Sequence, residues 1–196
     1  IIAKTPSKPK GAKWAESPRI TDRLKHEADG AGYLTPGFSH IFTIPSEGGS
    51  PRQLTSGDFN HGGNISWSPD GQYIYFSANR NEDWEYDFRN SEVYAVHTTN
   101  GTIKALTEQS GPDANPVVSP DGNYIAYTGY ADKVQTYQVW ELHVMDAWGN
   151  NKRTITTGFD RSVGNPVWAE NSKGLYFTYD DKGQTKIAYI SLKGEV

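Results

Sequence analysis

The sequence predicts an all-β fold, a partial β-propeller of about three to four four-stranded antiparallel blades, and three observations lead to this prediction. First, Trp67-Ser68-Pro69-Asp70-Gly71 recurs 51 residues later as Val118-Ser119-Pro120-Asp121-Gly122 and, after a further 50 residues, in a worn form at Trp168–Gly174. Second, the pair Leu54-Thr55 recurs with nearly the same period as Leu106-Thr107 and Ile155-Thr156. Third, the strand expected after the first hairpin motif is apolar on both faces.

The recurring motif has the composition of a tight turn between antiparallel strands. Proline presets φ at the second turn position, aspartate is well tolerated at the third, and glycine supplies the positive φ needed at the fourth. Each copy therefore predicts a strand, a hairpin turn and a second strand. Four such strands in about 50 residues is the plan of a propeller blade.

The apolar strand argues for blades that pack face to face. Tyr73 and Tyr75 lie on one face of it and Ile74 and Phe76 on the other. A half-solvated antiparallel strand would instead alternate apolar and polar residues. A β-sandwich with four-stranded halves is the alternative fold.

Four units follow an N-terminal segment. Residues 1–18 contain several prolines and lysines without periodicity, which predicts a linker or an extended edge segment. The propeller region then runs over 19–196. Its expected units are 19–58, 59–110, 111–160 and 161–196.

The strands of these units are expected as follows. In the first unit they lie at 19–25 and 39–45; in the second at about 63–67, 72–78, 92–97 and 102–107; in the third at 116–118, 124–127, 139–144 and 154–156; in the fourth at 166–168, 175–178 and 187–190. The first unit lacks clear early strands and the fourth lacks its last one. Because an unclosed arc exposes apolar faces and sheet edges, we expect the chain to self-associate.

Composition excludes several classes of partner. The net charge of −4 and the lack of a basic stripe argue against nucleic-acid and anionic-membrane binding. With no cysteine the chain has no disulfide and no thiolate metal site, and no cofactor is expected. No apolar run approaches the length of a membrane span, and no secretory signal is visible. Because the chain begins at Ile1, we expect it to be part of a longer protein, either cytoplasmic or periplasmic.

The repeated hairpin followed by an aromatic strand resembles TolB-type propeller repeats. A more specific resemblance is to the propellers of acylaminoacyl-peptidase-type enzymes, which belong to the prolyl oligopeptidase family of serine peptidases. It is carried by Gly11–Trp14, Arg19–Leu24, Asp29–Tyr33 and Pro51–Asp58. Together the two resemblances cover about residues 11–196.

This resemblance implies a second domain and an activity. In the family, a C-terminal α/β-hydrolase domain carries the catalytic Ser, Asp and His. The present sequence has no G-x-S-x-G nucleophile elbow, so no catalytic residue is expected within it. The expected parent is a hydrolase that cleaves short peptides at the N-terminus, of the acylaminoacyl or dipeptidyl peptidase type, with the propeller gating access to its active site. The alternative is a TolB-like propeller that binds another protein; a propeller enzyme with its site in the central channel is a third, less favoured reading.

One acidic and aromatic segment is a candidate substrate-contacting loop. It comprises Asp83, Trp84, Glu85, Tyr86 and Asp87. Related dipeptidyl-peptidase propellers have an Asp-Trp-x-Tyr segment leading into paired glutamates that hold the free amino terminus of the substrate, and here Asp87-Phe88 replaces that pair. The competing interpretation is a blade loop whose aromatic side chains pack on the neighbouring blade.

Other polar residues have simpler explanations. None of the five histidines lies in a catalytic or metal-binding motif, and His97 and His143 are expected to be structural. Asp70 and Asp121 belong to turns and lack the further carboxylates of a calcium site. No metal site is therefore predicted.

Overall fold

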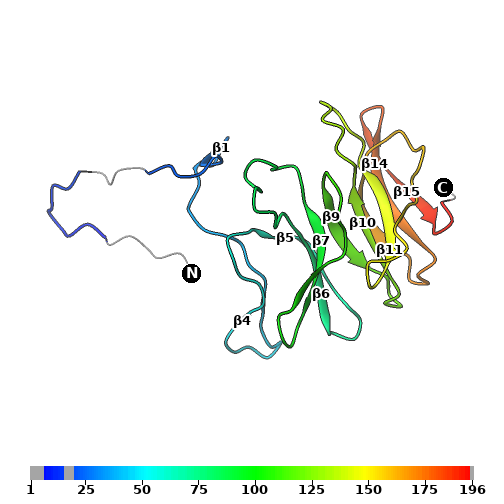
Figure 1. Ribbon diagram of the computed structural model, residues 1–196, viewed down its shortest axis with the longest axis horizontal. Coiled ribbons are helices and arrows are strands. Elements are labelled where there is room, and N and C mark those ends of the chain that lie inside the picture. Colours follow the sequence, from blue (N-terminus) through cyan, green and yellow to red (C-terminus); the bar gives the residue numbers. More distant parts are fainter. Residues whose placement is uncertain (1–6, 16–19, 195–196) are drawn as a thin grey trace.

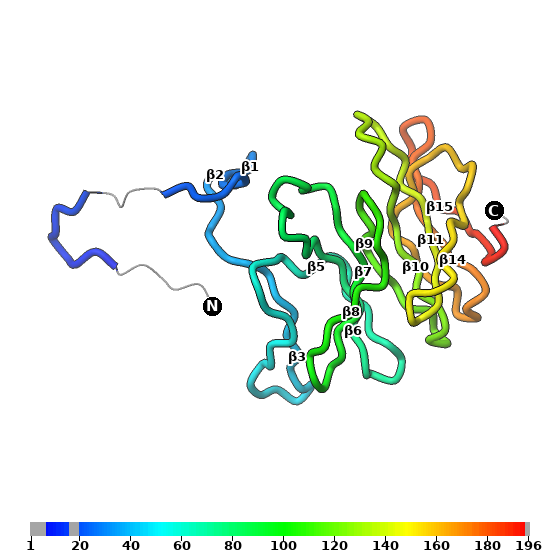
Figure 2. Tube along the Cα trace, in the orientation of Figure 1, coloured from blue at the N-terminus to red at the C-terminus, as the bar shows by residue number. Residues whose placement is uncertain are grey.

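The computed structural model describes residues 7–15 and 20–194, and Figure 1 shows that this part of the chain consists of strands, turns and loops. Fifteen strands and no helix occur within it. The predicted all-β fold with four-stranded antiparallel sheets is confirmed. Three sheets stand one after another along the chain, with the N-terminal hairpin to one side (Figure 2).

The three main sheets follow the repeat, and each pairs its strands in chain order. One is β5 (His61–Trp67), β6 (Tyr73–Ala78), β7 (Glu92–His97) and β8 (Ile103–Ala105); the next is β9 (Asp113–Val118), β10 (Tyr124–Gly129), β11 (Glu141–Asp146) and β12 (Arg153–Thr154); the last is β13 (Val163–Trp168), β14 (Gly174–Asp181) and β15 (Gln184–Ser191). Among the described residues the last sheet has three strands, the same number as the sequence predicts for this unit.

Two short pairs precede these sheets. β1 (Glu27–Ala28) pairs with β2 (Gly32–Tyr33), and β3 (Phe42–Thr43) pairs with β4 (Arg52–Gln53). The predicted strand at 19–25 is wrong for its described residues: 20–25 contain no strand, and Ile20 is 84% exposed because no sheet lies against it. Residue 19 and much of the predicted linker at 1–18 lie outside the described residues. Residues 7–15 of that linker contain no strand.

The strand predicted at 39–45 is shorter than expected, because side chains replace ladder partners at its start. The backbone N–H of Ser39 donates to Asn60 Oδ1, and that of Ile41 donates to Thr55 Oγ1. Side chains that bond the backbone in this way compete with strand pairing. Only Phe42 and Thr43 therefore pair with β4.

The hairpin motif closes through its serine and aspartate as well as through its glycine. Ser68 Oγ donates to Asp70 Oδ1 (2.5 Å) and accepts from the Tyr73 N–H (2.9 Å), while the Gln72 N–H donates to Asp70 Oδ1 (3.0 Å). Gly71 has φ 70°. The second copy repeats these bonds with Ser119, Asp121, Asn123 and Tyr124.

In the third hairpin a serine takes the turn position at which the motif predicts a glycine. Ser172 occupies the left-handed turn position, with φ 58°, and Gly174 begins β14 instead. A Cβ at Gly174 would lie 2.4 Å from the Ile190 carbonyl oxygen, so close strand packing requires this glycine. Ser172 also joins neighbouring blades, because its Oγ accepts from the Asp121 N–H (3.1 Å).

The repeated pairs Leu54-Thr55, Leu106-Thr107 and Ile155-Thr156, which we call the Leu-Thr marker, have a common structural role. In each pair the threonine anchors the start of the third strand of its unit. Thr55, Thr107 and Thr156 are buried, and their Oγ1 atoms accept from the N–H groups of Ile41, Val93 and Leu142, each at 2.9 Å. A buried backbone N–H without a partner destabilises a fold substantially. The marker therefore has a structural role.

Replacing Thr156 by valine is expected to lower the free energy of unfolding by about 1–3 kcal/mol, because the buried Leu142 N–H loses its acceptor while the side-chain shape is kept. Urea denaturation measures the change. Thr99→Val is the matched control, since Thr99 is exposed, and its effect should be under about 0.5 kcal/mol. Equal losses in both variants would contradict the anchoring role.

The core is divided among the junctions between blades. One cluster joins β3 and β4 to the β5–β8 sheet and contains Ile41, Leu54, Ile74 and Phe76. A second joins the β5–β8 and β9–β12 sheets, and a third joins the β9–β12 and β13–β15 sheets. Ile74, Tyr75 and Phe76 are each at most 3% exposed, so β6 is buried on both faces as its sequence indicates.

Candidate functional site

The candidate loop connects β6 to β7 and spans residues 79–91. It is folded by local hydrogen bonds: the Asp83 carbonyl accepts from the N–H groups of Tyr86 (2.8 Å) and Asp87 (3.1 Å). Asn79 Nδ2 donates to the Asp87 carbonyl (2.7 Å), and Asn90 Nδ2 donates to Asp87 Oδ2 (3.1 Å). The loop is therefore shaped by the backbone of Asp83 and by both the backbone and the side chain of Asp87.

A cavity of about 740 Å³ lies between this loop and the N-terminal segment. Leu24, Lys25 and Glu27 line it from the N-terminal side, and Trp84, Glu85, Tyr86 and Phe88 line it from the loop, with Asn60 and Asn79 between them. Figure 1 shows the β1 hairpin and the loop before β7 on the same side of the sheets. Trp84 also packs edge-on against Phe38, with ring centroids 6.0 Å apart, which holds the two segments together.

Of the five predicted residues, Trp84, Glu85 and Tyr86 line the cavity, and Asp83 and Asp87 do not. The structure also brings Lys25 and Glu27 to the same cavity. Sequence reasoning missed these two because it assigned 19–25 to a strand and gave β1 no role.

Glu85 has one carboxylate oxygen without a partner. Its Oε1 is buried and has no hydrogen-bond donor among the described residues, and the Asn90 Oδ1 atom is in the same state. A buried carboxylate oxygen strongly favours a charged donor. The cavity itself is lined by the Glu85 side chain and by the aromatic residues Trp84, Tyr86 and Phe88, a combination that can accommodate a protonated amine.

Two polar pairs lie at the junctions between blades, and all their members except the half-buried His40 are buried. His40 and His61 have ring centroids 5.2 Å apart; His61 donates from Nδ1 to the Ser39 carbonyl, and Arg80 Nη1 donates to His61 Nε2 (2.5 Å). Burial lowers the pKa of His61. This neutral ring is fully bonded, which indicates a structural role.

The second pair is Glu92 with Asp113, at the starts of β7 and β9. Thr107 Oγ1 donates to Glu92 Oε2 (2.5 Å), the Gln109 N–H donates to Glu92 Oε1 (3.0 Å), and Gln109 Nε2 donates to Asp113 Oδ1 (2.6 Å). Burial, followed by repulsion from Glu92, raises the pKa of Asp113 to about 7. Burial also raises the pKa of Glu92.

The two histidines expected to be structural are both bonded. His143 is 9% exposed, its Nε2 lies 3.3 Å from the Gly129 carbonyl, and Thr154 Oγ1 lies 3.0 Å from its Nδ1. Burial lowers the pKa of His143. His97 Nδ1 accepts from the Thr99 N–H (3.1 Å), and its ring contacts Tyr73.

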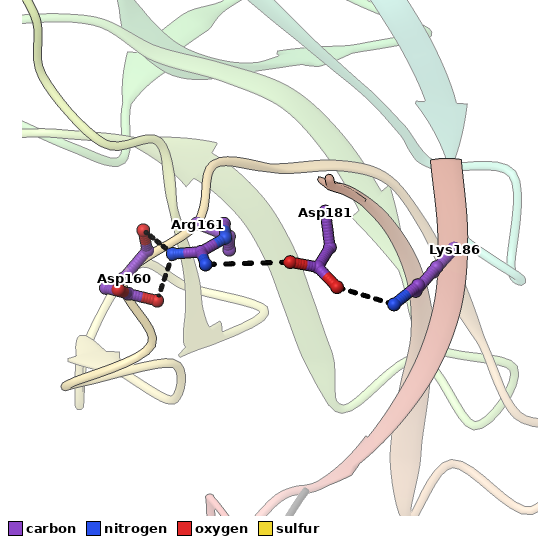
Figure 3. A network of polar contacts seen from close by, with 4 residues as sticks. All are labelled: Asp160, Arg161, Asp181 and Lys186. Carbon is purple, nitrogen blue, oxygen red and sulfur yellow. Dashed lines mark hydrogen bonds and ion pairs between the residues drawn. The ribbon is translucent and has the colours of Figure 1, made fainter. Parts of the chain in front are cut away.

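An ion-pair network lies on the last sheet (Figure 3). Arg161 bonds Asp160 (2.6 Å) and reaches Asp181 (3.6 Å), and Lys186 bonds the other oxygen of Asp181 (2.5 Å). It ties the loop before β13 to the β14–β15 hairpin. All four charges are paired, so it is not a candidate binding site.

Across residues 7–15 and 20–194, no group of three or more His, Asp or Glu side chains is placed to hold a metal ion. No helix in this same part of the chain is long and apolar enough to cross a membrane.

Comparison with known proteins places the fold. The TolB beta propeller domain (PD40) pattern matches residues 33–196. The chain resembles dipeptidyl-peptidase 5 of Porphyromonas gingivalis, with 31% identity over 131 residues, which is 66% of this chain and 19% of that protein. It therefore spans about a fifth of the length of this relative.

Solved structures agree on the architecture. A putative TolB from Agrobacterium tumefaciens has a TM-score of 0.62 at 19% identity, over 80% of this chain and 54% of that one. A Mycobacterium tuberculosis puromycin-hydrolyzing peptidase has a TM-score of 0.63 at 19% identity, over 80% and 25%. At this identity the likeness shows the fold, and the predicted β-propeller architecture is confirmed.

Proposed function

The chain belongs to the TolB β-propeller domain family, and from this premise we propose that it is the propeller portion of a serine peptidase that cleaves short peptides at their N-terminus. In this proposal an α/β-hydrolase domain of the same protein supplies the catalytic residues. The propeller limits access to that domain by size and contacts the bound peptide. Its substrates would be peptides from which a dipeptide or an acylated amino acid is released at the N-terminus.

The observation that carries the proposal is the similarity to dipeptidyl-peptidase 5, which extends over two thirds of the chain at 31% identity. Similarity to one further peptidase propeller supports it at the level of the fold. The activity of the whole protein is proposed from these relatives.

The cavity beside the β6–β7 loop supports a contact with the substrate. Glu85, which lines the cavity, would accept through its carboxylate from a protonated peptide amino terminus, and Trp84 and Tyr86 would flank that amino terminus. Glu85 stands one residue before Tyr86, so it is not at the position of the paired glutamates in related propellers. The same chemistry would then be provided from a different loop position.

Replacing Glu85 by alanine in the full-length protein is expected to lower kcat/KM for peptides with a free amino terminus roughly 10–100-fold, the equivalent of one charge-assisted hydrogen bond. Acylated peptides should be affected less than about threefold, because they carry no charge at that end. The readout is hydrolysis of matched free and acylated chromogenic peptides.

Glu82→Ala is the control, since this substitution also removes one negative charge from the same loop, but at an exposed position. Asp87→Ala tests the other predicted acid, and we expect it to destabilise the loop without changing the preference. An unchanged preference in Glu85→Ala would refute the amino-terminus contact, although the peptidase proposal itself would stand.

A second candidate is a non-catalytic TolB-like propeller that binds another protein. The family match and the likeness to the Agrobacterium tumefaciens TolB structure favour it as much as they favour the peptidase propeller. The discriminating observation is the sequence that follows residue 196 in the complete reading frame. A G-x-S-x-G motif within an α/β pattern there supports the peptidase; its absence from the whole reading frame supports the binding module.

A further inference from the structure

Two hollows meet at the end of the β5–β8 sheet that lies opposite the β6–β7 loop. The turns between β5 and β6 and between β7 and β8 occupy this end, and Figure 2 shows the loop and these turns at opposite ends of the sheet. Both hollows lie where the β5–β8 and β9–β12 sheets come together. Each of these sheets has four strands, so both walls are complete blades.

One hollow is a groove of about 440 Å³ that carries negative charge. Asp70 and Asp121 line it from the two motif turns, and Asp146 lines it from the end of β11. Hydrogen bonds from Ser68 to Asp70 and from Ser119 to Asp121 lower the pKa values of these two carboxyls, so both are charged at neutral pH. No Lys, Arg or His is among the described residues that line the groove. The three carboxylates are not placed to hold a metal ion, so their charge is open to a larger cation.

The other hollow is a cavity of about 230 Å³ that adjoins the groove. Both hollows are lined by Tyr73, Tyr75 and Trp148, so these rings stand between them. Leu106 adds to the apolar wall of the cavity. Lys104 lines the cavity too, but its ammonium group donates to the Trp148 carbonyl (3.0 Å). An acidic groove and a largely apolar cavity thus lie side by side.

Trp148 presents its ring from a fixed backbone. Its N–H donates to Asp146 Oδ1 (2.9 Å), and a Cβ on the next residue, Gly149, would lie 2.9 Å from the Leu106 carbonyl oxygen. The Trp148 side chain is nevertheless left largely uncovered, because the residue is 60% exposed and its ring meets Tyr73 only edge-on, with centroids 5.9 Å apart. Preorganised aromatic side chains of this kind are typical anchors of protein interfaces.

The repeat does not require an aromatic residue at this turn. The residue before the turn glycine is Trp148 in this unit, whereas it is Asn100 in the preceding unit and Lys193 in the last one. All three turns place their glycine against the preceding unit in the same way. The ring of Trp148 is therefore an addition to the blade and not a part of its plan.

The junction that holds the two hollows also lacks the ring that covers the next junction. There, Trp168 stacks near Tyr124, with centroids 6.2 Å apart, and is 8% exposed. Val118 occupies the position of Trp168 in the β9–β12 sheet, and Tyr73 occupies that of Tyr124 in the β5–β8 sheet. Since valine has no ring to stack on Tyr73, the aromatic surface of Tyr73 remains available beside the hollows.

We propose that the two hollows bind a basic segment of a partner protein, with an arginine side chain in the groove and an apolar neighbour of that arginine in the cavity. The guanidinium group would stack on Trp148 and pair with Asp70 or Asp121. Charge complementarity favours this occupant over a neutral or acidic segment, because three carboxylates line the groove.

This inference requires neither of the functions proposed above. A segment bound at this end of the sheets leaves the cavity beside the β6–β7 loop free, because that loop lies at the opposite end. Binding at the two hollows and hydrolysis of peptides can therefore be tested separately.

Fluorescence polarisation on the full-length protein tests the proposal with a labelled cyclic octapeptide that contains Arg-Leu-Arg. A head-to-tail cyclic peptide has no amino terminus and so does not act as a substrate of the proposed peptidase. We expect the same peptide with citrulline in place of both arginines to bind at least about tenfold more weakly, because citrulline keeps the shape of arginine without its charge. Added salt should weaken the binding of the arginine peptide.

Two substitutions locate the binding site. Trp148→Ala is expected to raise the Kd of the arginine peptide about tenfold, and Asp121→Asn about three- to tenfold. Asparagine keeps an oxygen that can accept from Ser119, so the turn is preserved. Tyr137→Ala and Asp58→Asn are the matched controls, because each removes an exposed side chain of the same kind outside both hollows, and each should change the Kd less than about twofold.

Far-UV circular dichroism establishes that each variant is folded. No binding of the arginine peptide at about 1 mM, equal affinities for the arginine and citrulline peptides, or an affinity that Trp148→Ala leaves unchanged would each overturn the proposal. Hydrolysis of linear peptides by the Trp148→Ala protein should equal that of the wild type, so the outcome of this test is independent of the peptidase assignment.

Discussion

Replacing Phe177 by alanine is expected to lower the free energy of unfolding by about 3–5 kcal/mol, the range for removing a buried aromatic side chain. Phe177 is 1% exposed and lies at the junction between the last two sheets. Its ring packs edge-on against Phe159, with centroids 5.7 Å apart, and contacts Tyr179. The cavity left behind would separate two sheets that hold each other mainly by apolar contact.

Urea denaturation followed by tryptophan fluorescence measures this loss at one fixed protein concentration. Tyr137→Ala is the control, because Tyr137 is 72% exposed and its removal should change stability by less than about 0.5 kcal/mol. A loss below about 1 kcal/mol in Phe177→Ala would mean that the junctions between sheets do not carry the stability of the fold.

Replacing Asp113 by asparagine is expected to stabilise the protein by about 2–4 kcal/mol at pH 8. Asp113 is 1% exposed, and burial next to Glu92 raises its pKa to about 7. At pH 8 the wild-type protein holds a second buried negative charge beside Glu92, and each unit of pKa shift corresponds to about 1.4 kcal/mol. Asparagine keeps the oxygen that accepts from Gln109 and carries no charge.

The sign of the pH dependence follows from linkage. The pKa of Asp113 in the folded state, about 7, is above its ordinary value of 3.8, so between these values the folded state binds more protons than the unfolded state. The contribution of Asp113 to stability is therefore fully present below about pH 4 and is lost as the pH rises through 7. The advantage of Asp113→Asn should vanish below pH 4.

Chemical denaturation from about pH 3 to about pH 8 gives this profile, because it spans both the ordinary and the raised pKa of Asp113. Glu108→Gln is the matched control, because it removes one negative charge from an exposed position near the same cluster. We expect a nearly flat difference between that control and the wild type. An Asp113→Asn protein less stable than the wild type at pH 8 would contradict the interpretation of this carboxyl pair.

The repeated parts of the fold could be predicted because their signals are local and occur more than once. Ser68, Asp70 and Gly71 close a turn among themselves, so five residues suffice to predict it. The marker threonines could be located by their period, although their role as acceptors for the N–H groups of Ile41, Val93 and Leu142 became visible only in the structure.

Elements that depend on distant partners could not be predicted in this way. The local sequence of residues 19–25 is compatible with a strand, but the described residues of this segment pair with no other strand. Gly174 looks like a turn glycine in sequence, whereas its place is set by the carbonyl of Ile190 on the adjacent strand. Ser172 holds the left-handed position that Gly71 and Gly122 hold in the other two hairpins, so the expected glycine is absent there although the backbone is the same.

The candidate site was predicted in part. Trp84, Glu85 and Tyr86 stand out in sequence because an acidic and aromatic segment interrupts the repeat, and these three line the cavity. Lys25 and Glu27 reach the same cavity from about 60 residues away, with no pattern that links them to the loop. Glu92 and Asp113 likewise belong to successive sheets and come together because those sheets pack against each other, with Gln109 donating to both.

The most direct test of the proposed function is the activity of the protein encoded by the complete reading frame that contains this chain. We expect the purified protein to release chromophore from dipeptidyl or acylaminoacyl substrates, and to lose that activity when the serine of a G-x-S-x-G motif outside this chain is replaced by alanine. A complete protein with no such motif, or one that hydrolyses neither substrate class, would contradict the assignment of this propeller to a peptidase.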